Sequence, residues 1–431
     1  MKLNIKNFAK IKNADILIDG ITVIAGENNT GKSTVGKILF SLYNSISGIE
    51  KKIDMQRKKE IRDMCQLMLR NYIAHEGTPR NRVLGSTMFP VRKISDTIAR
   101  IKEEKETIEL VEIEEIITDI ITRVVVDKDE IDKMLDIIRE MSKNVENILE
   151  LPEDIIVLEI LSRYFENVFY GQINSLIDKD SDAELKLRMK DKEINLLFEN
   201  DRCIKFVPEI NLLHNAIYID NPFIIDKLSS YEDLNITAQL LKELLTSSLN
   251  ENLMDGIIGT VLAKEKLSKI YETLGSVVDG KVQEQNDRFY FNKEGFNKPI
   301  SVENLSTGLK SFVVLKMLIE KGKIREKDVL ILDEPEVHLH PQWQIVYAEL
   351  IVLLQKYFDL SIIVTTHSPY FLDAINLYSV KYGLKEKVNY YLSSEKERGV
   401  EIEKVDVDQI YKKMSSPIQI LETLRYELNN Q

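Results

Sequence analysis

The pattern of apolar and polar residues predicts strands at the start of the chain, followed by a helix. Residues 2–8 and 15–19 alternate between apolar and polar, as half-buried strands do, and residues 10–14 are expected to form the turn between them. Residues 21–25 are apolar throughout, which is typical of a strand that is buried on both faces. The amphipathic run 34–42 then has the spacing of a helix.

A long stretch from residue 51 to about residue 179 has helical spacing. Breaks are expected at 76–79, at Phe89-Pro90 and at Leu151-Pro152, where glycine or proline interrupts the pattern. One apolar stripe forms either a short antiparallel helical hairpin or a face that packs on a neighbouring helix. The heptad pattern is not sustained, so no long coiled-coil arm is expected. The stripe consists of Ile131, Leu135, Ile138, Met141, Val145 and Ile148.

The remainder of the chain returns to strands, with a further helical segment at 236–278. The residues after the strand 360–364 predict a helix, two strands and a C-terminal helix from Val407. Strands are predicted at 183–189, 193–199, 202–207, 216–220, 288–291, 299–302, 329–332, 360–364, 388–392 and 400–405.

Composition is that of a folded protein. Of the 431 residues, 44 % are hydrophobic, which is enough for a sizeable core. No run approaches the ~18 apolar residues that span a bilayer, and the N-terminus opens on an alternating strand. We therefore expect a cytoplasmic protein without a membrane partner. Cys65 and Cys203 lie far apart in the sequence and predict neither a disulfide framework nor a zinc knuckle.

The stretch 26–33, G-E-N-N-T-G-K-S, fits the pattern G-x-x-x-x-G-K-[ST] between a predicted strand and a predicted helix. A strand, a glycine loop and a helix N-terminus in this order form a phosphate cradle, in which backbone N–H groups point at the phosphate oxygens. Lys32 would neutralise the phosphates, and the Ser33 hydroxyl would hold Mg²⁺. The residues assigned to this nucleotide site are Gly26, Asn28, Asn29, Thr30, Gly31, Lys32, Ser33 and Thr34.

A second anion-binding helix terminus is predicted at 305–310, L-S-T-G-L-K, just before the helical run 311–321. Serine and glycine are common at a helix start, where backbone N–H groups attract anions. The nucleotide-binding residues assigned here are Ser306, Thr307, Gly308 and Lys310.

Two adjacent carboxylates, Asp333 and Glu334, follow the apolar run 329–332. This pattern indicates a buried strand whose C-terminal end brings charge to the edge of the sheet where ligands bind in open α/β folds. Asp333 would orient a Mg²⁺-bound water, and Glu334 would polarise the attacking water as a general base. The alternative, a helix N-cap beside a surface acid, does not explain why two carboxylates end a buried strand.

A histidine follows the predicted strand 360–364 in the sequence T-T-H-S-P. In this position His367 can hydrogen-bond the terminal phosphate of a nucleotide and detect its presence. His338 and His340 lie two residues apart, as metal ligands can, but no cysteine or third histidine is near them in the sequence, so zinc is not expected. We interpret Trp343 as a packing or interface anchor.

In this order, the four segments resemble the ATP-binding-cassette class of P-loop ATPases, and within it the soluble branch of SMC, RecF and OLD-type proteins. The resemblance implies that 26–33 is the Walker A loop, 305–310 the signature, Asp333-Glu334 the Walker B pair and His367 the switch histidine. ATP and Mg²⁺ would be the cofactors, with Lys32, Glu334 and His367 as catalytic residues. The class also implies a homodimer or larger homo-oligomer, in which the signature of one subunit caps the γ-phosphate held by another.

The implied fold is α/β, an ABC-type ATPase head with a mixed sheet and flanking helices that is interrupted by a largely helical insertion. A Q-loop glutamine cannot be assigned, and Gln56, Gln66 and the strand end Asp220-Asn221 are candidates. The predicted parts are a first core segment 1–48, the helical insertion 49–182, core strands 183–220, a helical lid 221–287 and a second core segment 288–431.

The residues after His367 depart from the OLD-type pattern, in which a Toprim nuclease follows the ATPase. Asp406 and Asp408 form a D-x-D, but too little chain follows for a nuclease domain, so we interpret both as surface acids. The layout is similar to the ATPase subunits of two-component bacterial anti-phage systems such as Septu and PARIS. That resemblance implies an oligomeric ATPase that controls a separate effector protein, a nuclease encoded nearby.

The charge distribution supports an alternative, a RecF-like or SMC-like ATPase that binds DNA in repair or maintenance. The net charge of −12 argues against a protein that coats nucleic acid, yet residues 51–93 contain eleven Lys/Arg and four Asp/Glu. This basic stretch is either a solvated helical face or a docking surface for an acidic partner or a phosphate backbone. The nucleic-acid contacts predicted by the alternative include Arg80, Arg82, Arg92 and Lys93 within the segment from Lys51 to Lys93.

Overall fold

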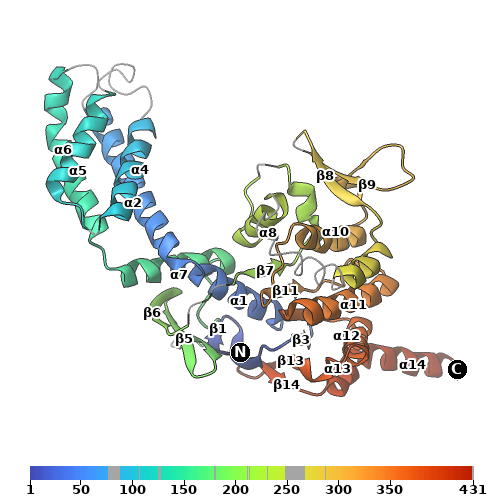
Figure 1. Ribbon diagram of the computed structural model, residues 1–431. Coiled ribbons are helices and arrows are strands. Elements are labelled where there is room, and N and C mark those ends of the chain that lie inside the picture. The colour runs from blue at the N-terminus through green and yellow to red at the C-terminus, as the bar shows by residue number, and fades with distance from the viewer. Residues whose placement is uncertain are drawn as a thin grey trace. The chain divides into compact units, whose positions relative to one another are not determined.

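Two compact units make up the protein (Figure 1). The computed structural model describes residues 1–75, 88–105, 107–124, 128–178, 181–210, 212, 214–230, 232–247, 267–286 and 288–429. An α/β unit consists of Met1–Ser47 and Ser162–Gln431, and a helical unit consists of Gly48–Leu161. The predicted insertion 49–182 extends past the helical unit, because residues 162–182 belong to the α/β unit. The division of the later residues into core strands 183–220, a helical lid 221–287 and a second core segment 288–431 stays a prediction.

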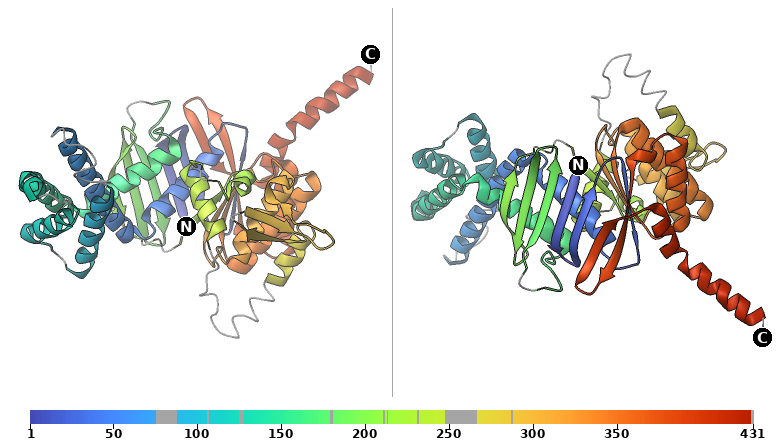
Figure 2. Two further views of the ribbon diagram at one scale, coloured as in Figure 1. Left: turned by 90° about the horizontal axis from the view of Figure 1, so that it is seen from above. Right: turned by 90° about the horizontal axis from the view of Figure 1, so that it is seen from below.

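A mixed sheet organises the α/β unit (Figure 2), with the strand order β6-β5-β4-β1-β2-β14-β13-β3-β12-β11-β7. From β13 to β7 the neighbouring strands are parallel, whereas β6, β5, β4, β1 and β2 pair antiparallel. This arrangement confirms the predicted α/β fold with a mixed sheet. The strands are β1 Lys2–Phe8, β2 Ile11–Leu17, β3 Ile21–Gly26, β4 Ala183–Met189, β5 Lys192–Glu199, β6 Arg202–Pro208, β7 Ala216–Ile219, β11 Val329–Asp333, β12 Ser361–Thr366, β13 Val388–Lys396 and β14 Gly399–Lys404.

The parallel strands place the predicted chemical segments at one edge of the sheet. β12 pairs with β3 on one side and with β11 on the other, so that Val364 lies beside both Val23 and Leu332. β7 pairs with β11 in the same direction, with Ile219 beside Leu332. Since parallel strands all end at the same edge, the residues that follow these strands converge there.

Helices flank this sheet and share its core. α1 (Lys32–Ile46) contacts β7 and β11, and α11 (Pro341–Phe358) packs against α12 (Pro369–Lys381). α10 (Thr307–Glu320) contacts η1 (Pro222–Lys227), a short 3-10 helix. The start of α12 is specified locally, because the Ser368 hydroxyl accepts a hydrogen bond from the backbone N–H of Phe371 and a proline follows the cap.

Gly36 allows α1 to lie close to the sheet. A methyl group on Gly36 would lie 2.7 Å from Cγ2 of Ile331 and 3.2 Å from Cε2 of Tyr218. Overpacking of this kind costs about 1–3 kcal/mol, so Gly36→Ala is expected to lower the free energy of unfolding by that amount. Chemical denaturation measures the change. Gly275→Ala is the matched control, because a methyl group there meets nothing within 4 Å; equal stability of the two variants would contradict the close-approach argument.

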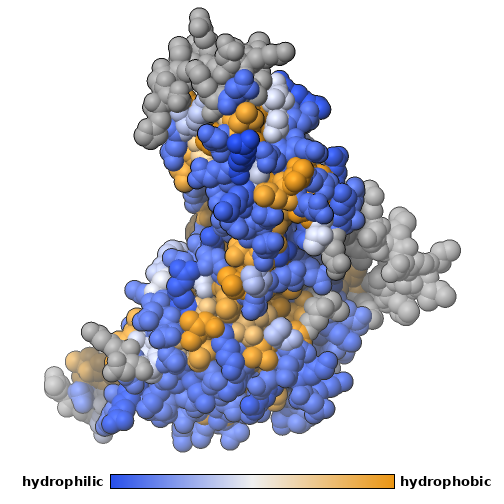
Figure 3. Space-filling model, turned by 90° about the vertical axis from the view of Figure 1, so that its left-hand side faces the viewer, coloured by the Kyte–Doolittle hydropathy of each residue, from blue (hydrophilic) through white to orange (hydrophobic). Residues whose placement is uncertain are grey.

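Helices of the helical unit pack on one another as a bundle. α2 (Ile49–His75) contacts α4 (Met88–Glu104) and α6 (Lys128–Leu149), and α5 (Leu110–Thr122) contacts the same two helices. In the predicted apolar stripe, Ile138, Met141 and Val145 of α6 are fully buried in the core of this bundle. The stripe therefore packs on neighbouring helices, one of which is α5, the helix before it in the chain. Hydrophobic side chains also interrupt the mostly hydrophilic surface of the face shown in Figure 3.

Two predicted breaks in the helical unit have different outcomes. The break at Leu151-Pro152 is confirmed, since α6 ends at Leu149 and α7 (Glu153–Phe169) begins after the proline. The break predicted at Phe89-Pro90 lies in the first turn of α4, which begins at Met88, and it stays a prediction because residues 76–87 lie outside the described ranges. Proline is tolerated there, where its missing N–H would have no partner within the helix. The predicted break at 76–79 lies outside the described residues.

Some strand predictions also differ from the structure. The turn expected at 10–14 is shorter, because β2 already begins at Ile11 and Ala9 turns the chain with φ of 48°. A small sheet with the order β10-β9-β8 contains β8 (Lys281–Gln285), which has polar side chains and no apolar alternation to reveal it. Its partners are β9 (Arg288–Asn292) and β10 (Ile300–Ser301).

The remaining helices complete the described chain. α8 (Ile236–Thr246) and the helical residues 267–275 lie in the segment predicted as helical, and α13 (Val407–Met414) and α14 (Ser416–Asn429) follow the last strand. Within the ranges given above, no helix is both long and apolar enough to cross a bilayer. Cys65 and Cys203 are free and buried, and burial raises the pKa of each thiol to about 12.

Candidate functional site

The predicted phosphate loop, 26–33, leaves β3 and enters α1 in a conformation that requires its glycines. A Cβ atom on Gly26 would lie 2.5 Å from the carbonyl oxygen of Ser393, and Gly31 has φ of 77°. Asn29 also has positive φ, 67°. Gly31 is the N-cap of α1 and provides no side chain to cap it, so the first N–H groups of the helix are left to bind another partner. This is the geometry of an anion-binding helix N-terminus.

Lys32 folds back over the loop that precedes it. Its Nζ atom donates hydrogen bonds to the carbonyl oxygens of Gly26, at 3.1 Å, and Glu27, at 2.8 Å. The same atom lies 3.4 Å from Oε1 of Glu334, and the lysine side chain is 3 % exposed. A buried ammonium group is thus held at the phosphate loop, beside the carboxylate that was predicted to be the general base.

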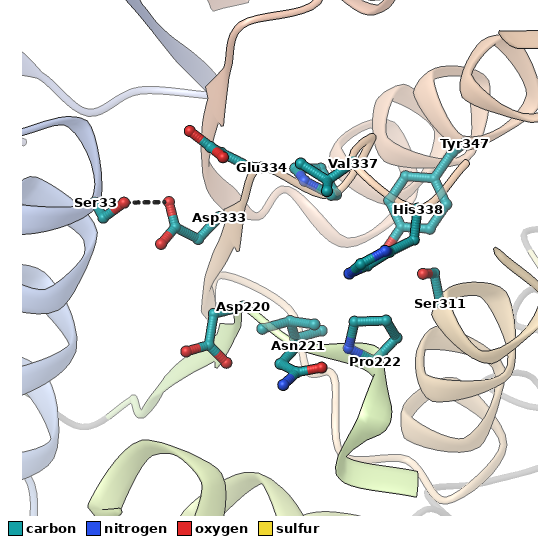
Figure 4. Close-up of a pocket in the computed structure, with 12 residues that line it drawn as sticks. Ser33, Asp220, Asn221, Pro222, Ser311, Asp333, Glu334, Val337, His338 and Tyr347 are labelled. Carbon is teal, nitrogen blue, oxygen red and sulfur yellow. Dashed lines mark hydrogen bonds between the residues drawn. The ribbon is translucent and has the colours of Figure 1, made fainter. Parts of the chain in front are cut away.

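Asp333 is fixed by three hydroxyl groups from different elements. Its Oδ1 atom accepts hydrogen bonds from Oγ of Ser33, at 2.9 Å (Figure 4), and from Oγ1 of Thr365. Its Oδ2 atom accepts a hydrogen bond from Oη of Tyr218, at 2.6 Å. Burial, together with the Asp333 carboxylate, raises the pKa of Tyr218 well above its usual value, so the tyrosine stays a donor. Ser33 and Asp333, predicted as a pair, are therefore in contact across 300 residues of sequence.

The oxygen atoms at this position suit Mg²⁺. Ser33 offers a hydroxyl and Asp333 a carboxylate, and Asp220 faces the same cavity from the end of β7 (Figure 4). Partial burial and the neighbouring Asp333 charge raise the pKa of Asp220. A cation bound nearby would lower that pKa again. The described residues contain no cluster of three or more His, Cys, Asp or Glu side chains that could hold a metal. Mg²⁺ commonly binds one or two carboxylates plus substrate phosphates, and Ser33 and Asp333 would provide the protein part of such a donor set.

Glu334 adopts an unusual backbone conformation. Its φ of 48° lies in the left-handed region, which a residue with a side chain rarely occupies. The backbone N–H of Glu334 donates to both Oγ1 and the carbonyl oxygen of Thr365, at 2.9 and 3.2 Å, and these contacts hold the conformation. The Glu334 side chain is 30 % exposed and can meet water. Strain of this kind is concentrated at functional sites.

His367 lies beside the same carboxylate. Its Nδ1 atom is 3.6 Å from Oε1 of Glu334, and its side chain is 45 % exposed. The structure therefore brings together Lys32, Glu334 and His367, the three residues predicted to be catalytic, around one carboxylate oxygen.

Two cavities adjoin the phosphate loop. One of about 240 Å³ lies beside Ser33, Asp333 and Glu334 (Figure 4), and one of about 350 Å³ lies on the Lys32 and Thr34 side of the loop. Ser33 and Glu334 line both cavities. His338, considered from the sequence only as a metal ligand, also lines the smaller cavity. Further lining residues that the sequence did not single out are Lys10, Lys37, Phe169, Tyr170 and Gln172.

The Q-loop candidates lie in different units of the protein. Asp220 and Asn221 line the smaller cavity, whereas Gln56 and Gln66 lie in α2 of the helical unit. Asp220 follows β7, which pairs with β11, so strand order brings it next to Asp333. Nothing in the spacing of residues along the sequence could select it, since that neighbourhood depends on the sheet.

Other loop residues have local roles. The Thr30 hydroxyl donates to the carbonyl oxygen of Glu27 at 2.8 Å, and the Ser393 hydroxyl donates to the carbonyl oxygen of Thr30. Asn28 is exposed. Asn29 and Thr34 line the larger cavity.

The predicted signature residues lie away from the phosphate loop of their own chain. Ser306 is the exposed N-cap of α10 and makes no side-chain cap hydrogen bond. Ser306, Thr307 and Gly308 line neither cavity. A Cβ atom on Gly308 would lie 3.0 Å from both the Trp343 ring and the carbonyl oxygen of His338, so glycine is needed for this contact.

Lys310 has partners within its own chain. It is buried, its Nζ atom lies 2.6 Å from Oδ1 of Asp226 and donates to the carbonyl oxygen of Glu303 at 3.0 Å, and it lies over the ring of Phe223. These contacts tie α10 to η1. A role of Lys310 in nucleotide binding stays a prediction.

The segment after Asp333-Glu334 has structural contacts. Trp343 packs edge-on against Phe312 with 6.0 Å between ring centroids, as expected for a packing anchor. Nδ1 of His340 accepts a hydrogen bond from the backbone N–H of Gln342 and caps α11, while His338 packs against Phe223.

Two further predicted features lie outside these cavities. Asp406 and Asp408 are exposed at the start of α13. In the basic stretch, Lys58 pairs with Asp96 at 2.6 Å and Arg92 lies 3.8 Å from the same carboxylate. Arg80 and Arg82 lie outside the described residues, and Lys93 is exposed.

Comparison with known proteins finds relatives that match only part of this chain. The chain is 25 % identical to the Septu protein PtuA of Bacillus thuringiensis over 218 residues, which are 47 % of this chain and 52 % of that protein. It is 28 % identical to the "Retron Ec83 probable ATPase" of Escherichia coli over 198 residues, 39 % of this chain and 33 % of that protein. The chain thus spans about half the length of the first relative and a third of the second. The predicted resemblance to a Septu ATPase subunit agrees with the first match.

The solved structures that match include heads of SMC proteins. The SMC head domain of Thermotoga maritima matches with a TM-score of 0.36 and 11 % identity, covering 94 % of this chain and 98 % of that one. The SMC head bound to the C-terminal winged-helix domain of ScpA matches with a TM-score of 0.38 and 13 % identity, covering 95 % and 98 %.

The family is established by a match that covers most of the chain. The model of the AAA ATPase domain family AAA_15 matches residues 1–372, which include the phosphate loop, Asp333, Glu334 and His367. The predicted P-loop ATPase class is thereby confirmed. The chain belongs to the AAA_15 family of AAA ATPase domains.

Proposed function

We propose that the protein binds ATP with Mg²⁺ and hydrolyses it to ADP and phosphate in the cytoplasm, where both are available. The observation that supports this is the convergence of five side chains at the phosphate loop, from the start of α1 and from the C-terminal ends of β11 and β12: Lys32, Ser33, Asp333, Glu334 and His367. The free N–H groups at the start of α1 would bind phosphate oxygens, and the AAA ATPase family match agrees with this assignment.

Each side chain has a distinct task in the proposed reaction. Lys32 carries positive charge to the β- and γ-phosphates, and Ser33 and Asp333 hold Mg²⁺, which neutralises charge on the phosphates when bound. Glu334 accepts the proton of the attacking water at its carboxylate, whose exposed fraction leaves it accessible. His367 hydrogen-bonds the transferred phosphoryl group from the neighbouring strand end.

We also propose that catalysis needs a second copy of the chain. The N-terminus of α10 carries Ser306, Thr307 and Gly308, yet these residues line neither cavity of their own chain. In a head-to-tail homo-oligomer, this helix end would approach the γ-phosphate held by another subunit and bind it through its free N–H groups.

Ser306→Arg tests the head-to-tail arrangement. The bulky cation at the exposed start of α10 should leave ATP binding by the same chain unchanged but lower turnover by more than about tenfold, as expected for loss of a stabilising contact to the transition state. Steady-state phosphate release and nucleotide titration measure the two effects.

A mixing experiment gives the control. Ser306→Arg protein mixed with Lys32→Ala protein can form one intact composite site from the unmodified halves, so partial activity should return. Full activity of purely monomeric protein, or no change in Ser306→Arg, would contradict the arrangement.

For the biological role, we propose that the ATPase cycle controls a separate effector protein, a nuclease, in bacterial anti-phage defence. Similarity to the Septu protein PtuA and to the retron Ec83 protein supports this proposal. The exposed apolar side chains of α14, among them Ile420, Leu421 and Leu428, are available for a protein partner. The second candidate, a DNA-associated ATPase, rests on the exposed cations of α2 and α4.

One purification separates the two roles. Glu334→Gln protein is expressed with its genomic neighbours, purified in ATP and Mg²⁺, and its companions are identified by mass spectrometry and by the ratio of absorbance at 260 and 280 nm. A stoichiometric protein partner supports effector control. Nucleic acid without a protein partner supports the DNA-associated alternative, whose binding should fall steeply with salt.

A further inference from the structure

Glu336, two residues after Glu334, is a buried carboxylate with no task in the mechanism above. Its side chain is 2 % exposed. The Oε1 atom accepts two hydrogen bonds, from Oγ1 of Thr366 at 2.5 Å and from the backbone N–H of His367 at 3.0 Å. The Oε2 atom is buried and has no hydrogen-bond partner in the structure described.

Packing alone does not account for a glutamate at this position. Burying a carboxyl oxygen without a partner is unfavourable, and an apolar residue of similar volume would avoid that cost. Burial also raises the pKa of Glu336, which shows how poorly this environment supports its charge. The useful part of the side chain is therefore Oε1, the atom that has two donors.

The two donors belong to Thr366 and His367, at the point where the chain leaves β12. Thr366 ends the strand and His367 follows it, so both hydrogen bonds to Oε1 act on the point where the backbone turns. The His367 ring then lies with Nδ1 at 3.8 Å from Oε1 of Glu336 and 3.6 Å from Oε1 of Glu334. The imidazole thus lies near both carboxylates, beside the proposed base.

A second connection braces the same turn. The Ser368 hydroxyl donates to Oε1 of Gln344 at 2.8 Å, and Nε2 of Gln344 donates to the carbonyl oxygens of Glu336 and Leu339, at 3.4 and 3.2 Å. The loop after β11 and the turn after β12 are therefore joined twice, once through the Glu336 side chain and once through Gln344.

We propose that Glu336 is a positioning residue that holds the Thr366–His367 turn so that the His367 ring stays beside Glu334. The inference rests on the proposed ATP hydrolysis, in which His367 contacts the transferred phosphoryl group. This positioning role of Glu336 requires a hydrogen-bond acceptor at Oε1 and does not require a negative charge.

The test compares Glu336→Met with Glu336→Gln. Methionine fills a similar volume without an acceptor, so His367 is released and kcat should fall by about 10- to 100-fold, as for a small misplacement of a catalytic group, while the ATP concentration for half-maximal rate stays within about threefold. Glutamine keeps an acceptor oxygen for both donors and should retain kcat within about threefold of wild type. Unchanged kcat in Glu336→Met, or equal loss in both variants, would overturn the proposal.

A double-mutant cycle with His367→Ala shows whether the effect passes through the histidine. Once the imidazole is absent, adding Glu336→Met should change kcat by no more than about twofold. A multiplied loss in the double variant would show that Glu336 acts by another route and would overturn the proposal.

Controls separate this inference from folding and from the proposed function. Glu349 is the matched control, because it is 16 % exposed and accepts hydrogen bonds from Lys381 and Tyr382 away from the cavities, so Glu349→Met should leave kcat unchanged. Wild type and Glu334→Gln are assayed alongside. Full turnover in Glu334→Gln would contradict the proposed base, whereas wild-type kcat in Glu336→Met with an inactive Glu334→Gln would overturn only the role of Glu336.

Discussion

Glu334→Gln is expected to bind ATP normally and to hydrolyse it about 10²- to 10⁴-fold more slowly than wild type. The amide has the same shape as the carboxylate but cannot accept the proton of the attacking water. The phosphate loop, Lys32 and the Ser33–Asp333 pair are unchanged by the substitution. Because the bound nucleotide is not consumed, the head-to-tail assembly should accumulate in ATP and Mg²⁺.

Single-turnover phosphate release and analytical ultracentrifugation measure the two consequences of Glu334→Gln. The Glu349→Met variant, whose carboxylate lies away from the cavities, serves as a control for loss of a partly buried glutamate. Wild-type turnover in Glu334→Gln would remove this residue as the base. Slow turnover without a larger assembly would contradict the proposed oligomer but not the base.

Lys32→Ala is expected to abolish measurable ATP binding. Its ammonium group is the cation held over the phosphate loop, and it is positioned by the carbonyl oxygens of Gly26 and Glu27. Without it, the phosphates would face the Glu334 carboxylate with no cation between them. Loss of a charge-assisted contact to a multiply charged ligand costs about 1.5–3 kcal/mol per hydrogen bond, so the loss of two such contacts, one to each phosphate, should lower the affinity at least about 100-fold.

Isothermal titration with ATP in Mg²⁺ measures this affinity. Lys381→Ala removes an exposed lysine of α12 and controls for the change in net charge. Thermal unfolding verifies that Lys32→Ala is folded, since the substitution also removes two hydrogen bonds of the loop. Normal ATP affinity in folded Lys32→Ala protein would show that the nucleotide site lies elsewhere.

The central part of the fold could be predicted because its signals are local. Strands that are buried on both faces appear as apolar runs, and three of them, 21–25, 329–332 and 360–364, agree with β3, β11 and β12 within two residues at either end. The chemical residues follow these strands directly. Since parallel strands end at a common edge, a contact such as Ser33 to Asp333 follows from the order of the segments.

Contacts between remote segments could not be predicted in this way. Tyr218 donates to Asp333 because β7 pairs with β11, and Tyr170 lines a cavity because residues 173–176 hydrogen-bond Ala9 after the first strand. No spacing of residues along the sequence indicates the contact of Tyr218 or the position of Tyr170. Lys310 likewise pairs with Asp226, 84 residues away, through the packing of α10 on η1.

The sequence by itself determined the phosphate loop, the acidic strand end and the histidine that follows the next strand, because each depends on a few consecutive residues and on strand burial. Only the tertiary structure decided how those groups are held. The positive φ of Glu334, the closeness of α1 at Gly36 and the hydrogen bonds from the His367 turn to Glu336 all arise when separate strands and helices pack together. Packing sets distances between residues that no local pattern relates, and those distances are what place the proposed base, the lysine and the histidine around one oxygen atom.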